Sequence, residues 1–459
     1  MKNALLVSCL GIAFMRARPV ITGLLFCFGL AACAPPATWR QVHSDASNTG
    51  TLIVGTKPAA MGTALTGVLP PIGTASPVIA PNGTVYIASW EPGGGGVGTG
   101  GVGTLGHGAM WRLASTGIPS IMGNSGDLPG QLSTAAVDEA GNVYAAQYLT
   151  FGQAVPQSAL LKWDTALGNM KSVRINGIAL SAPKVLDGTG QSPLIVQTYS
   201  TITNAQSSNY SVSKHVLILN NQLTPLADWE TCAYQPSAPG GFHVPGTELP
   251  APYPESASVG IRSIDSDRGK TYYLVAPGDG CGVTFYTIDP TLTNPKVLTY
   301  IEHRGSNSMF LTSPAISADG IAVIADGDHH ITAYDITTGD QKWQVTTTGF
   351  IAATPVMAPG ALGYVYAATY SEILKLDLAT GNAFPTQGLT GMSTDATPAA
   401  GGNLLFVVTD AGLFTFQLSD LQLIAAAPFP GGKPSPAIGP DGYVIVPTTD
   451  FRMLRFPGP

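Results

Sequence analysis

The stretch Tyr334-Asp335-Ile336-Thr337-Thr338-Gly339-Asp340-Gln341-Lys342-Trp343 decides the fold of this chain. A β-branched and aromatic strand ends there in a tight turn, where the Asp side chain accepts hydrogen bonds from nearby amides and Gly adopts positive φ. The Trp that follows is suited to packing between neighbouring sheets. Two shorter apolar strands precede the stretch, one directly after Ser313-Pro314 and one over residues 321–325. The unit as a whole predicts a small antiparallel sheet.

The same unit recurs along the chain, which indicates a repeat architecture. Each copy opens with a small residue followed by Pro, Ala or Ser, and the eight openings are Ser76-Pro77, Thr134-Ala135, Ala182-Pro183, Ala257-Ser258, Ser313-Pro314, Thr354-Pro355, Thr397-Pro398 and Ser435-Pro436. The last copies are 41, 43 and 38 residues apart, whereas the earlier intervals of 48 to 75 residues indicate insertions. Some copies depart from the pattern, since Gln417 stands where others have Asp.

Composition agrees with an all-β protein and excludes several functional classes. The 459 residues include 55 Gly and 37 Pro, and only 11% are charged. Abundant Thr, Val and Tyr favour strands, and abundant Gly, Pro and Ser favour turns. The formal net charge of −7 gives no electrostatic basis for binding nucleic acid. Beyond residue 33, no apolar stretch approaches the roughly 20 residues that a membrane-spanning helix requires.

Residues 334–343 resemble the repeat of PQQ-like (quinoprotein-type) β-propellers, whose blades carry an Ala-x-Asp-x-x-Thr-Gly-x-x-x-Trp signature. The segment over residues 39–50, beginning at Trp39, is similar to the entry segment of such domains. The resemblance covers residues 39–459 and implies an all-β fold, an eight-bladed β-propeller of four-stranded antiparallel blades. The expected organisation is a lipoprotein signal peptide (residues 1–33), an entry segment and linker (34–62) and the propeller (63–459).

The end of the chain predicts how the ring closes. When the strands of each blade are lettered A to D outward from the axis, the last copy stops after its third strand, Met453-Leu454-Arg455-Phe456, and would leave an exposed edge. We expect residues 63–69 to supply the missing outer strand, because Leu65-Thr66-Gly67 aligns with Thr347-Thr348-Gly349 ahead of the next opening. Trp39 is then expected to pack outside this strand, and Trp39 itself filling the edge is the alternative. The closed propeller is expected to be monomeric.

The N-terminus predicts a lipid anchor. Arg16 and Arg18 precede an apolar run over residues 20–30, which ends in Leu30-Ala31-Ala32-Cys33. This tetrapeptide resembles a bacterial lipobox, so Cys33 is the expected lipidated residue. The start is either Met1 or Met15. By resemblance to sorted lipoproteins, Ala34 favours the outer membrane, facing the periplasm or the cell surface. Acyl chains on one Cys anchor a protein without a spanning helix.

The insertions predict which face of the propeller binds a partner. B–C hairpins and D–A connections open on the same face, and the insertions at residues 90–107, 147–158, 198–214 and 230–255 all fall there. We expect this face to bind a protein, peptide or polysaccharide through aromatic side chains of the insertions, namely Trp90, Tyr148, Phe151, Tyr199, Tyr210, Tyr234, Phe242, His243 and Tyr253. The alternative for each ring is that it only packs its own loop onto the propeller.

Three further motifs have simpler interpretations than the sites they resemble. The glycine-rich residues 91–103 lack the Lys-Ser/Thr of a phosphate-binding loop and predict a flexible tether. Residues 326–330, Asp-Gly-Asp-His-His, offer metal-ligand types, but in a hairpin of a minimal copy they favour turn chemistry. Residues 265–269 lack the third acid and the closing Glu of a calcium loop and also predict a hairpin. No metal site is therefore predicted.

Cys232 and Cys281 are the two cysteines beyond the signal segment. In an oxidising compartment they are expected to form a disulfide, since the topology places both on the face of the insertions. Two buried free thiols are the alternative.

Function is the least determined property. Quinoprotein dehydrogenases of this architecture use an adjacent Cys-Cys pair, a calcium ion and an Asp base, whereas none of the five cysteines here are adjacent. No PQQ or calcium is therefore predicted, and a PQQ-dependent dehydrogenase is the least favoured function. We expect a non-catalytic, lipid-anchored binding or scaffold module. The alternative is a component of outer-membrane protein assembly of the BamB type, which shares the anchor and the blade count.

Overall fold

The computed structural model divides the chain into two compact units, Met1–Pro36 and Ala37–Pro459. It describes residues 41, 44–45, 51–52, 64–68, 73–91, 106–114, 118–149, 157–179, 181–186, 193–203, 211–234, 258–266, 269–278, 282–288, 296–302, 312–351, 353–359, 363–389, 394, 396–431 and 434–456. All of these lie in the second unit. Within them no helix is long and apolar enough to cross a membrane.

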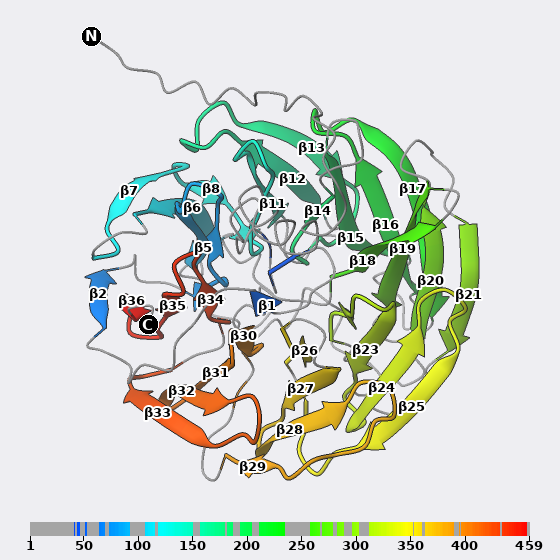
Figure 1. Cartoon of the computed structure of the whole chain (residues 1–459). Helices are drawn as coiled ribbons and strands as arrows, with labels where there is room; N and C mark the ends of the chain where they lie inside the picture. The colour runs from blue at the N-terminus through cyan, green and yellow to red at the C-terminus, as the bar shows by residue number, and fades with distance from the viewer. Residues whose placement is uncertain are drawn as a thin grey trace, which may run out of the picture. The chain divides into compact units, whose positions relative to one another are not determined.

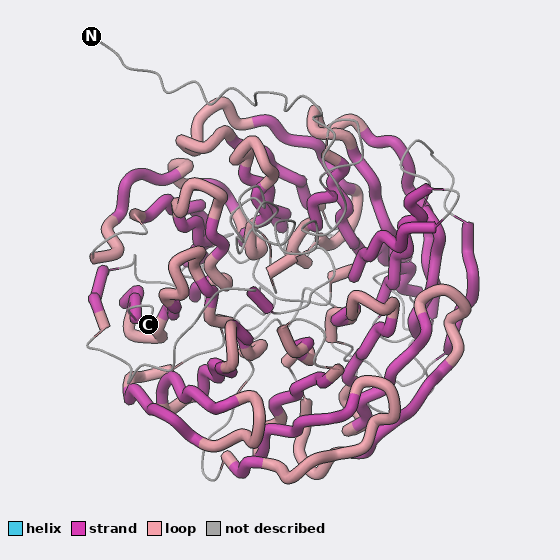
Figure 2. The backbone as a smooth tube through the Cα atoms, in the orientation of Figure 1, coloured by secondary structure: helices cyan, strands magenta, loops and turns pink. Residues whose placement is uncertain are grey.

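The second unit is an all-β, eight-bladed propeller, as predicted, and its blades follow one another around a central axis (Figures 1 and 2). Blades 1 and 2 comprise β3 (Gly73–Thr74), β4 (Val78–Ile79), β5 (Val85–Glu91), β6 (His107–Leu113), β7 (Ile121–Asn124), β8 (Leu128–Pro129), β9 (Gln131–Leu132), β10 (Ala136–Val137), β11 (Val143–Tyr148), β12 (Ser158–Trp163) and β13 (Lys171–Ile175). Blades 3 and 4 comprise β14 (Lys184–Leu186), β15 (Leu194–Thr203), β16 (Ser211–Leu219), β17 (Pro225–Tyr234), β18 (Gly260–Ser266), β19 (Gly269–Gly278), β20 (Gly282–Ile288) and β21 (Lys296–Glu302).

The second half of the ring is more regular. Blades 5 and 6 comprise β22 (Ala315–Ile316), β23 (Ile321–Ala325), β24 (His330–Asp335), β25 (Gln341–Thr346), β26 (Val356–Met357), β27 (Tyr364–Ala368), β28 (Glu372–Asp377) and β29 (Gln387–Gly388). Blades 7 and 8 comprise β30 (Ala399–Gly401), β31 (Leu404–Thr409), β32 (Gly412–Gln417), β33 (Leu423–Pro428), β34 (Ala437–Ile438), β35 (Val444–Pro447) and β36 (Arg452–Phe456). β1 (Thr51–Leu52) and β2 (Leu65–Val68) come from the N-terminal segment.

The signature turn behaves as its residues predict. In blade 5 the Asp335 carboxylate accepts hydrogen bonds from the amide and the hydroxyl of Thr337, and Gly339 has a φ of 80°. The side chain of Trp343 is buried between blades and donates its Nε1–H to the carbonyl of Leu378 in blade 6 at 2.8 Å. The motif therefore shapes one blade and attaches it to the next.

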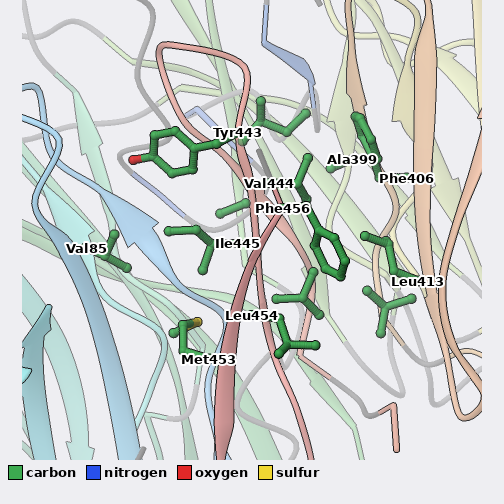
Figure 3. Close-up of a cluster of buried hydrophobic side chains, with 14 of the residues drawn as sticks. Val85, Ala399, Phe406, Leu413, Tyr443, Val444, Ile445, Met453, Leu454 and Phe456 are labelled. Carbon is green, nitrogen blue, oxygen red and sulfur yellow. The ribbon is translucent and has the colours of Figure 1, made fainter. Parts of the chain in front are cut away.

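The hydrophobic core lies between neighbouring blades. Seven clusters of buried residues join successive blades, and the largest joins blades 7, 8 and 1. In that cluster Ile445 and Leu454 of blade 8 lie among Val85 of blade 1 and Phe406 and Leu413 of blade 7 (Figure 3). Each blade thus buries both faces, so its stability depends on two neighbours.

The small residue that opens each copy has a structural role. At five of the eight junctions, the amide of this residue donates a hydrogen bond to the hydroxyl of the equivalent residue in the next blade. The bonds run from Ser76 to Thr134, from Ser258 to Ser313, from Thr354 to Thr397, from Thr397 to Ser435 and from Ser435 to Ser76. The last bond closes the ring from blade 8 to blade 1. It also follows that Ser258, rather than Ala257, is the opening residue of blade 4, one position later than the sequence alignment placed it.

The N-terminal segment supplies the outer strand of blade 8, as predicted. β2 pairs antiparallel with β36, and Leu65 lies opposite Arg455. The expected edge is therefore filled, and the ring is closed by strands from both ends of the propeller.

Upstream of β2, the entry segment contacts the innermost strands of two opposite blades. The side-chain amide of Gln41 donates to the carbonyl of Val185 on β14 at 2.8 Å and accepts from the amide of Val185 at 2.9 Å. Ten residues later, β1 pairs parallel with β30, so that Thr51 lies opposite Ala400. Blades 3 and 7 stand four positions apart in a ring of eight, so the described residues of this segment, which we call the strap (residues 41–52), lie at the inner edges of two opposite blades.

The expected packing of Trp39 outside the closing strand of blade 8 stays a prediction. Trp39 itself lies outside the described residues, but Gln41 and Ser44 are buried at the inner strand of blade 3. Lys184 of that strand, also buried, donates its ammonium to the carbonyl of Asp45. The inner edges of A strands carry backbone groups that need partners, and the strap provides them on both sides of the axis.

Candidate functional site

Among the described residues of the face that carries the B–C and D–A connections, which we call the insertion face, the strands of blade 3 extend furthest. These strands, β15, β16 and β17, contain 10, 9 and 10 residues, against five or six in the middle strands of blades 5 to 7. Thr203 pairs with Ser211, and Val212 pairs with Tyr234. Much of the insertion expected as loop is therefore a three-stranded sheet, and about four extra residue pairs raise it roughly 13 Å above a minimal blade.

A second extension lies on the opposite face, which carries the A–B and C–D connections. In blade 4 the A–B hairpin continues from the pair Gly260–Val275 to the pair Ser266–Gly269. The calcium-like residues 265–269 thus form the end of a hairpin, as predicted. Both faces carry an elaboration, whereas the four insertions predicted from the sequence concern one face only.

A polar cluster fixes the base of the blade 3 extension. Tyr199 stacks on His215 with ring centroids 4.7 Å apart, and its hydroxyl lies 2.7 and 2.8 Å from the two carboxylate oxygens of Asp228. His215 Nε2 lies 3.2 Å from the hydroxyl oxygen of Thr201, and its Nδ1 lies 3.7 Å from Asp228 Oδ1. Burial and the neighbouring Asp228 raise the pKa of Tyr199 far above its usual range.

This cluster joins three strands but lacks the geometry of a catalytic triad. The distance of 3.7 Å between His215 and Asp228 is too long for the hydrogen bond that orients a catalytic imidazole. The Asp228 carboxylate instead accepts a hydrogen bond from the hydroxyl of Tyr199. We interpret the cluster as a support that holds the projecting sheet in place.

A disulfide lies in the same extension. Cys232, on β17, is disulfide-bonded. Its predicted partner, Cys281, lies outside the described residues, so the pairing with Cys281 stays a prediction. The adjacent Thr231 accepts a hydrogen bond at its carbonyl from the hydroxyl of Thr284 in blade 4, at 3.4 Å. The extension of blade 3 is therefore linked to its neighbour close to Cys232.

The predicted aromatic residues do not form one group in the described structure. Tyr148 and Tyr199 are buried, so these two rings pack within the propeller and do not offer a contact surface. Trp90 lies on β5 and Tyr234 on β17. Phe151, Tyr210, Phe242, His243 and Tyr253 lie outside the described residues, as does Cys33. The part of the insertion face that the structure describes is thus formed by backbone extension of blade 3 more than by aromatic rings.

The metal-like motif at residues 326–330 is a turn between β23 and β24. One carboxylate oxygen of Asp326 accepts from the amides of Asp328 and His330, both at 2.9 Å. The other lies 3.5 Å from His330 Nδ1. No group of three His, Cys, Asp or Glu suited to a metal ion occurs among the described residues. The glycine-rich residues 92–103 lie outside them.

The described residues offer no specific support for the quinone that the resemblance to quinoproteins implies. At the inner edges of blades 3 and 7, Val185 and Ala400 are already paired with Gln41 and Thr51. The sequence has no adjacent cysteines for quinoprotein chemistry. That no PQQ is bound stays a prediction.

Comparison with known proteins identifies the fold. The model of the family "Outer membrane protein assembly factor BamB" matches residues 302–422, about a quarter of the chain. Quinohemoprotein alcohol dehydrogenase from Comamonas testosteroni is 13% identical with a TM-score of 0.58, and the match covers 92% of this chain and 81% of that one. A europium-containing methanol dehydrogenase is 12% identical with a TM-score of 0.55, covering 90% of each chain. BamB from Moraxella catarrhalis is 12% identical with a TM-score of 0.49, covering 86% and 98%.

No curated protein matches the chain significantly in sequence. At 11 to 13% identity the structural similarities establish a fold, which hosts enzymes and assembly factors alike. The repeat signature and the eight blades agree with these comparisons, and the chain is an eight-bladed β-propeller similar to those of the PQQ-like type.

Proposed function

We propose that the chain is a non-catalytic, lipid-anchored scaffold of the bacterial envelope that holds a protein partner on its insertion face. The observation that carries this proposal is the three-stranded extension of blade 3, a rigid projection braced by Tyr199, His215 and Asp228. Rigid elements that project from a stable scaffold present binding groups at low entropic cost. The family match to an outer-membrane assembly factor supports the envelope location, with the lipid on Cys33 as the anchor.

A role like that of BamB in outer-membrane protein assembly is the second candidate. The family match over residues 302–422 favours it. The match covers blades 5 to 7 and not the blade 3 extension, which is why we prefer the broader function.

The experiment is a crosslinking pull-down from intact cells with two matched hairpin truncations. In the test variant, a two-residue Asn-Gly turn replaces residues 201–213, which removes the extension of blade 3. In the control variant, the same turn replaces residues 264–271, which removes most of the extension of blade 4 on the opposite face and keeps the buried Tyr272. We expect the test variant to lose the crosslinked protein and the control variant to retain it, with cooperative thermal unfolding in both. Retention by the test variant, or loss in the control alone, would refute the proposed binding face.

A further inference from the structure

Exposed apolar side chains gather at one place on this propeller. The opposite face carries six large ones at the starts of D strands or in the C–D connection of three consecutive blades, 7, 8 and 1. We call them the apolar arc, namely Leu423, Ile424, Leu65, Ile118, Ile121 and Met122. Phe384 of blade 6 and Met170 of blade 2 flank the arc on the same face. Within the described residues, the exposed large hydrophobics of the insertion face are Tyr370 and Phe451.

The outer strands of one half of the ring contain charged residues, and those of the other half do not. β29, β33, β2 and β7, of blades 6, 7, 8 and 1, contain no Asp, Glu, Lys or Arg. The outer strands of blades 2 to 5 all contain charged residues. Charged side chains are the usual protection of an exposed edge strand, and half of this rim lacks them.

The arc follows three adjoining blades. Its strands follow one another along the circumference, from β33 through β2 to β7 (Figure 1). At Gly67 of β2, an added Cβ would lie 1.8 Å from the carbonyl oxygen of Pro119, so blade 8 is in contact with the C–D connection of blade 1. One core cluster joins blades 7, 8 and 1. Exposed apolar patches mark interaction sites.

We propose that the apolar arc rests on the surface of a lipid bilayer. This step depends on the envelope location proposed above, and it assigns the two faces of the propeller different roles. Leucine, isoleucine and methionine side chains partition into the interfacial region without help from charge. The N-terminal segment that is expected to carry the lipid also supplies β2, the central strand of the arc.

The charge of the side chains around the arc predicts which lipid headgroups the arc prefers. The chain has a formal net charge of −7, Asp420 is exposed in the C–D turn of blade 7, and Asp377 and Asp164 lie partly exposed where the C strands of blades 6 and 2 end. An anionic lipid surface would repel these carboxylates. None of the six arc side chains is basic, and the exposed Lys171 lies beyond the arc, next to Met170 of blade 2. We therefore expect a preference for uncharged lipid, opposite to that of proteins that bind through basic patches.

The reach of the predicted anchor is compatible with this orientation. Gln41 is eight residues after Cys33, and an extended chain of eight steps spans at most roughly 28 Å. The middle strands of a minimal blade, at five or six residues, are about 20 Å long. The chain is therefore long enough for a lipid on Cys33 to reach the plane of the opposite face with Gln41 at the inner strand of blade 3. The insertion face then points away from the membrane.

The test is flotation of an unlipidated chain that starts at residue 34, after the expected lipidation site, on phosphatidylcholine vesicles. The chain from Ala37 onward is one compact unit, so this protein contains every described element. The arc variant carries Ile121→Thr, Met122→Gln, Leu423→Gln and Ile424→Thr. The control variant carries Tyr370→Ser and Phe451→Ser, exposed hydrophobics of the insertion face. Circular dichroism and thermal unfolding check the folding of both, and the blade 1 and blade 7 pairs are also made separately.

We expect the wild type and the control variant to float, and the arc variant to partition about tenfold less or lower still. Flotation should fall as phosphatidylglycerol replaces phosphatidylcholine, and added salt should not weaken binding to the uncharged vesicles. Failure of the wild type to float, equal flotation of the arc variant, or stronger binding to anionic vesicles would each overturn the proposal. A self-associating wild type whose dimer is lost in the arc variant, without flotation, would assign the arc to a second copy instead. The readout needs no protein partner, so its failure is distinct from failure of the proposed function.

Discussion

Replacing Thr397 with Val tests whether the hydroxyls that link the blades hold the ring together. Thr397 is buried at the opening of blade 7, and its hydroxyl oxygen lies 3.1 Å from the amide nitrogen of Thr354 in blade 6. Valine has nearly the same shape, so the substitution removes one hydrogen bond and leaves the buried Thr354 amide without that acceptor. An unsatisfied buried amide costs about 1 to 3 kcal/mol, and we expect a loss of about 2 kcal/mol in the free energy of unfolding.

The matched control is Thr397→Ser, which keeps the hydroxyl and removes a methyl group, at a cost of roughly 0.8 kcal/mol. If the hydrogen bond contributes more to stability than the methyl group, Thr397→Val lowers the free energy of unfolding more than Thr397→Ser does. If packing of the methyl group contributes more, Thr397→Ser has the larger effect. Unfolding entropy of about 2.1 cal/mol/K per residue, taken over the whole propeller, converts 2 kcal/mol into a Tm decrease of roughly 2 °C. Calorimetry measures this decrease, and hydrogen exchange at the Thr354 amide reports the bond directly. Unchanged exchange at Thr354 in the Val variant would refute the reasoning.

Three further outcomes are expected. Gly381→Ala should lower the free energy of unfolding by about 1 to 3 kcal/mol more than Gly363→Ala does. Both glycines have positive φ, but an added Cβ at Gly381 would lie 2.7 Å from the buried tryptophan of blade 5, whereas at Gly363 it would meet no atom within 4 Å. Equal Tm values for the two variants would contradict this. Gln41→Glu should lower Tm, because a carboxylate cannot donate to the Val185 carbonyl and would place a second acceptor against it, and an unchanged Tm would contradict this. Burial raises the pKa of Tyr148 to about 12, above the value of 10 in the unfolded chain, so its contribution to stability is complete below pH 10 and is lost between pH 10 and 12; a 295 nm titration of Tyr148→Phe against wild type should lack one late-titrating phenol.

The repeat pattern predicted most of the fold because its information is local. The turn at Asp335 and Gly339, the apolar strands and the opening residue recur within each copy, and each copy only needs neighbours that resemble it. Closure was also predictable, since a chain that ends after the third strand of a blade leaves an edge that another segment has to cover. The register of blade 4 was misjudged by one residue because its opening, Ser258, lacks the following proline.

The candidate site was predicted less well. Loop length indicated where the insertions lie, but aromatic content did not reveal that Tyr148 and Tyr199 point into the propeller. The apolar arc had a readable signal that we did not use, because the outer strands of four successive copies lack charge. Whether a side chain is exposed depends on whether its strand is the outermost of the blade. The sequence of one copy cannot show that neighbouring blades also have uncharged outer strands.

The sequence by itself determined the number of blades, the order of strands within each blade and the need for an N-terminal strand at the closure. These follow from periodic apolar residues and turn chemistry, which act over a few residues. Only the tertiary structure decided that Gln41 and Thr51 meet opposite sides of the ring, and that Leu65, Ile121 and Leu423 lie on three adjoining blades. Blades 3 and 7 face each other, and blades 1, 7 and 8 adjoin, only because the ring is closed. Closure brings together residues hundreds of positions apart, and no local pattern records which of them will meet.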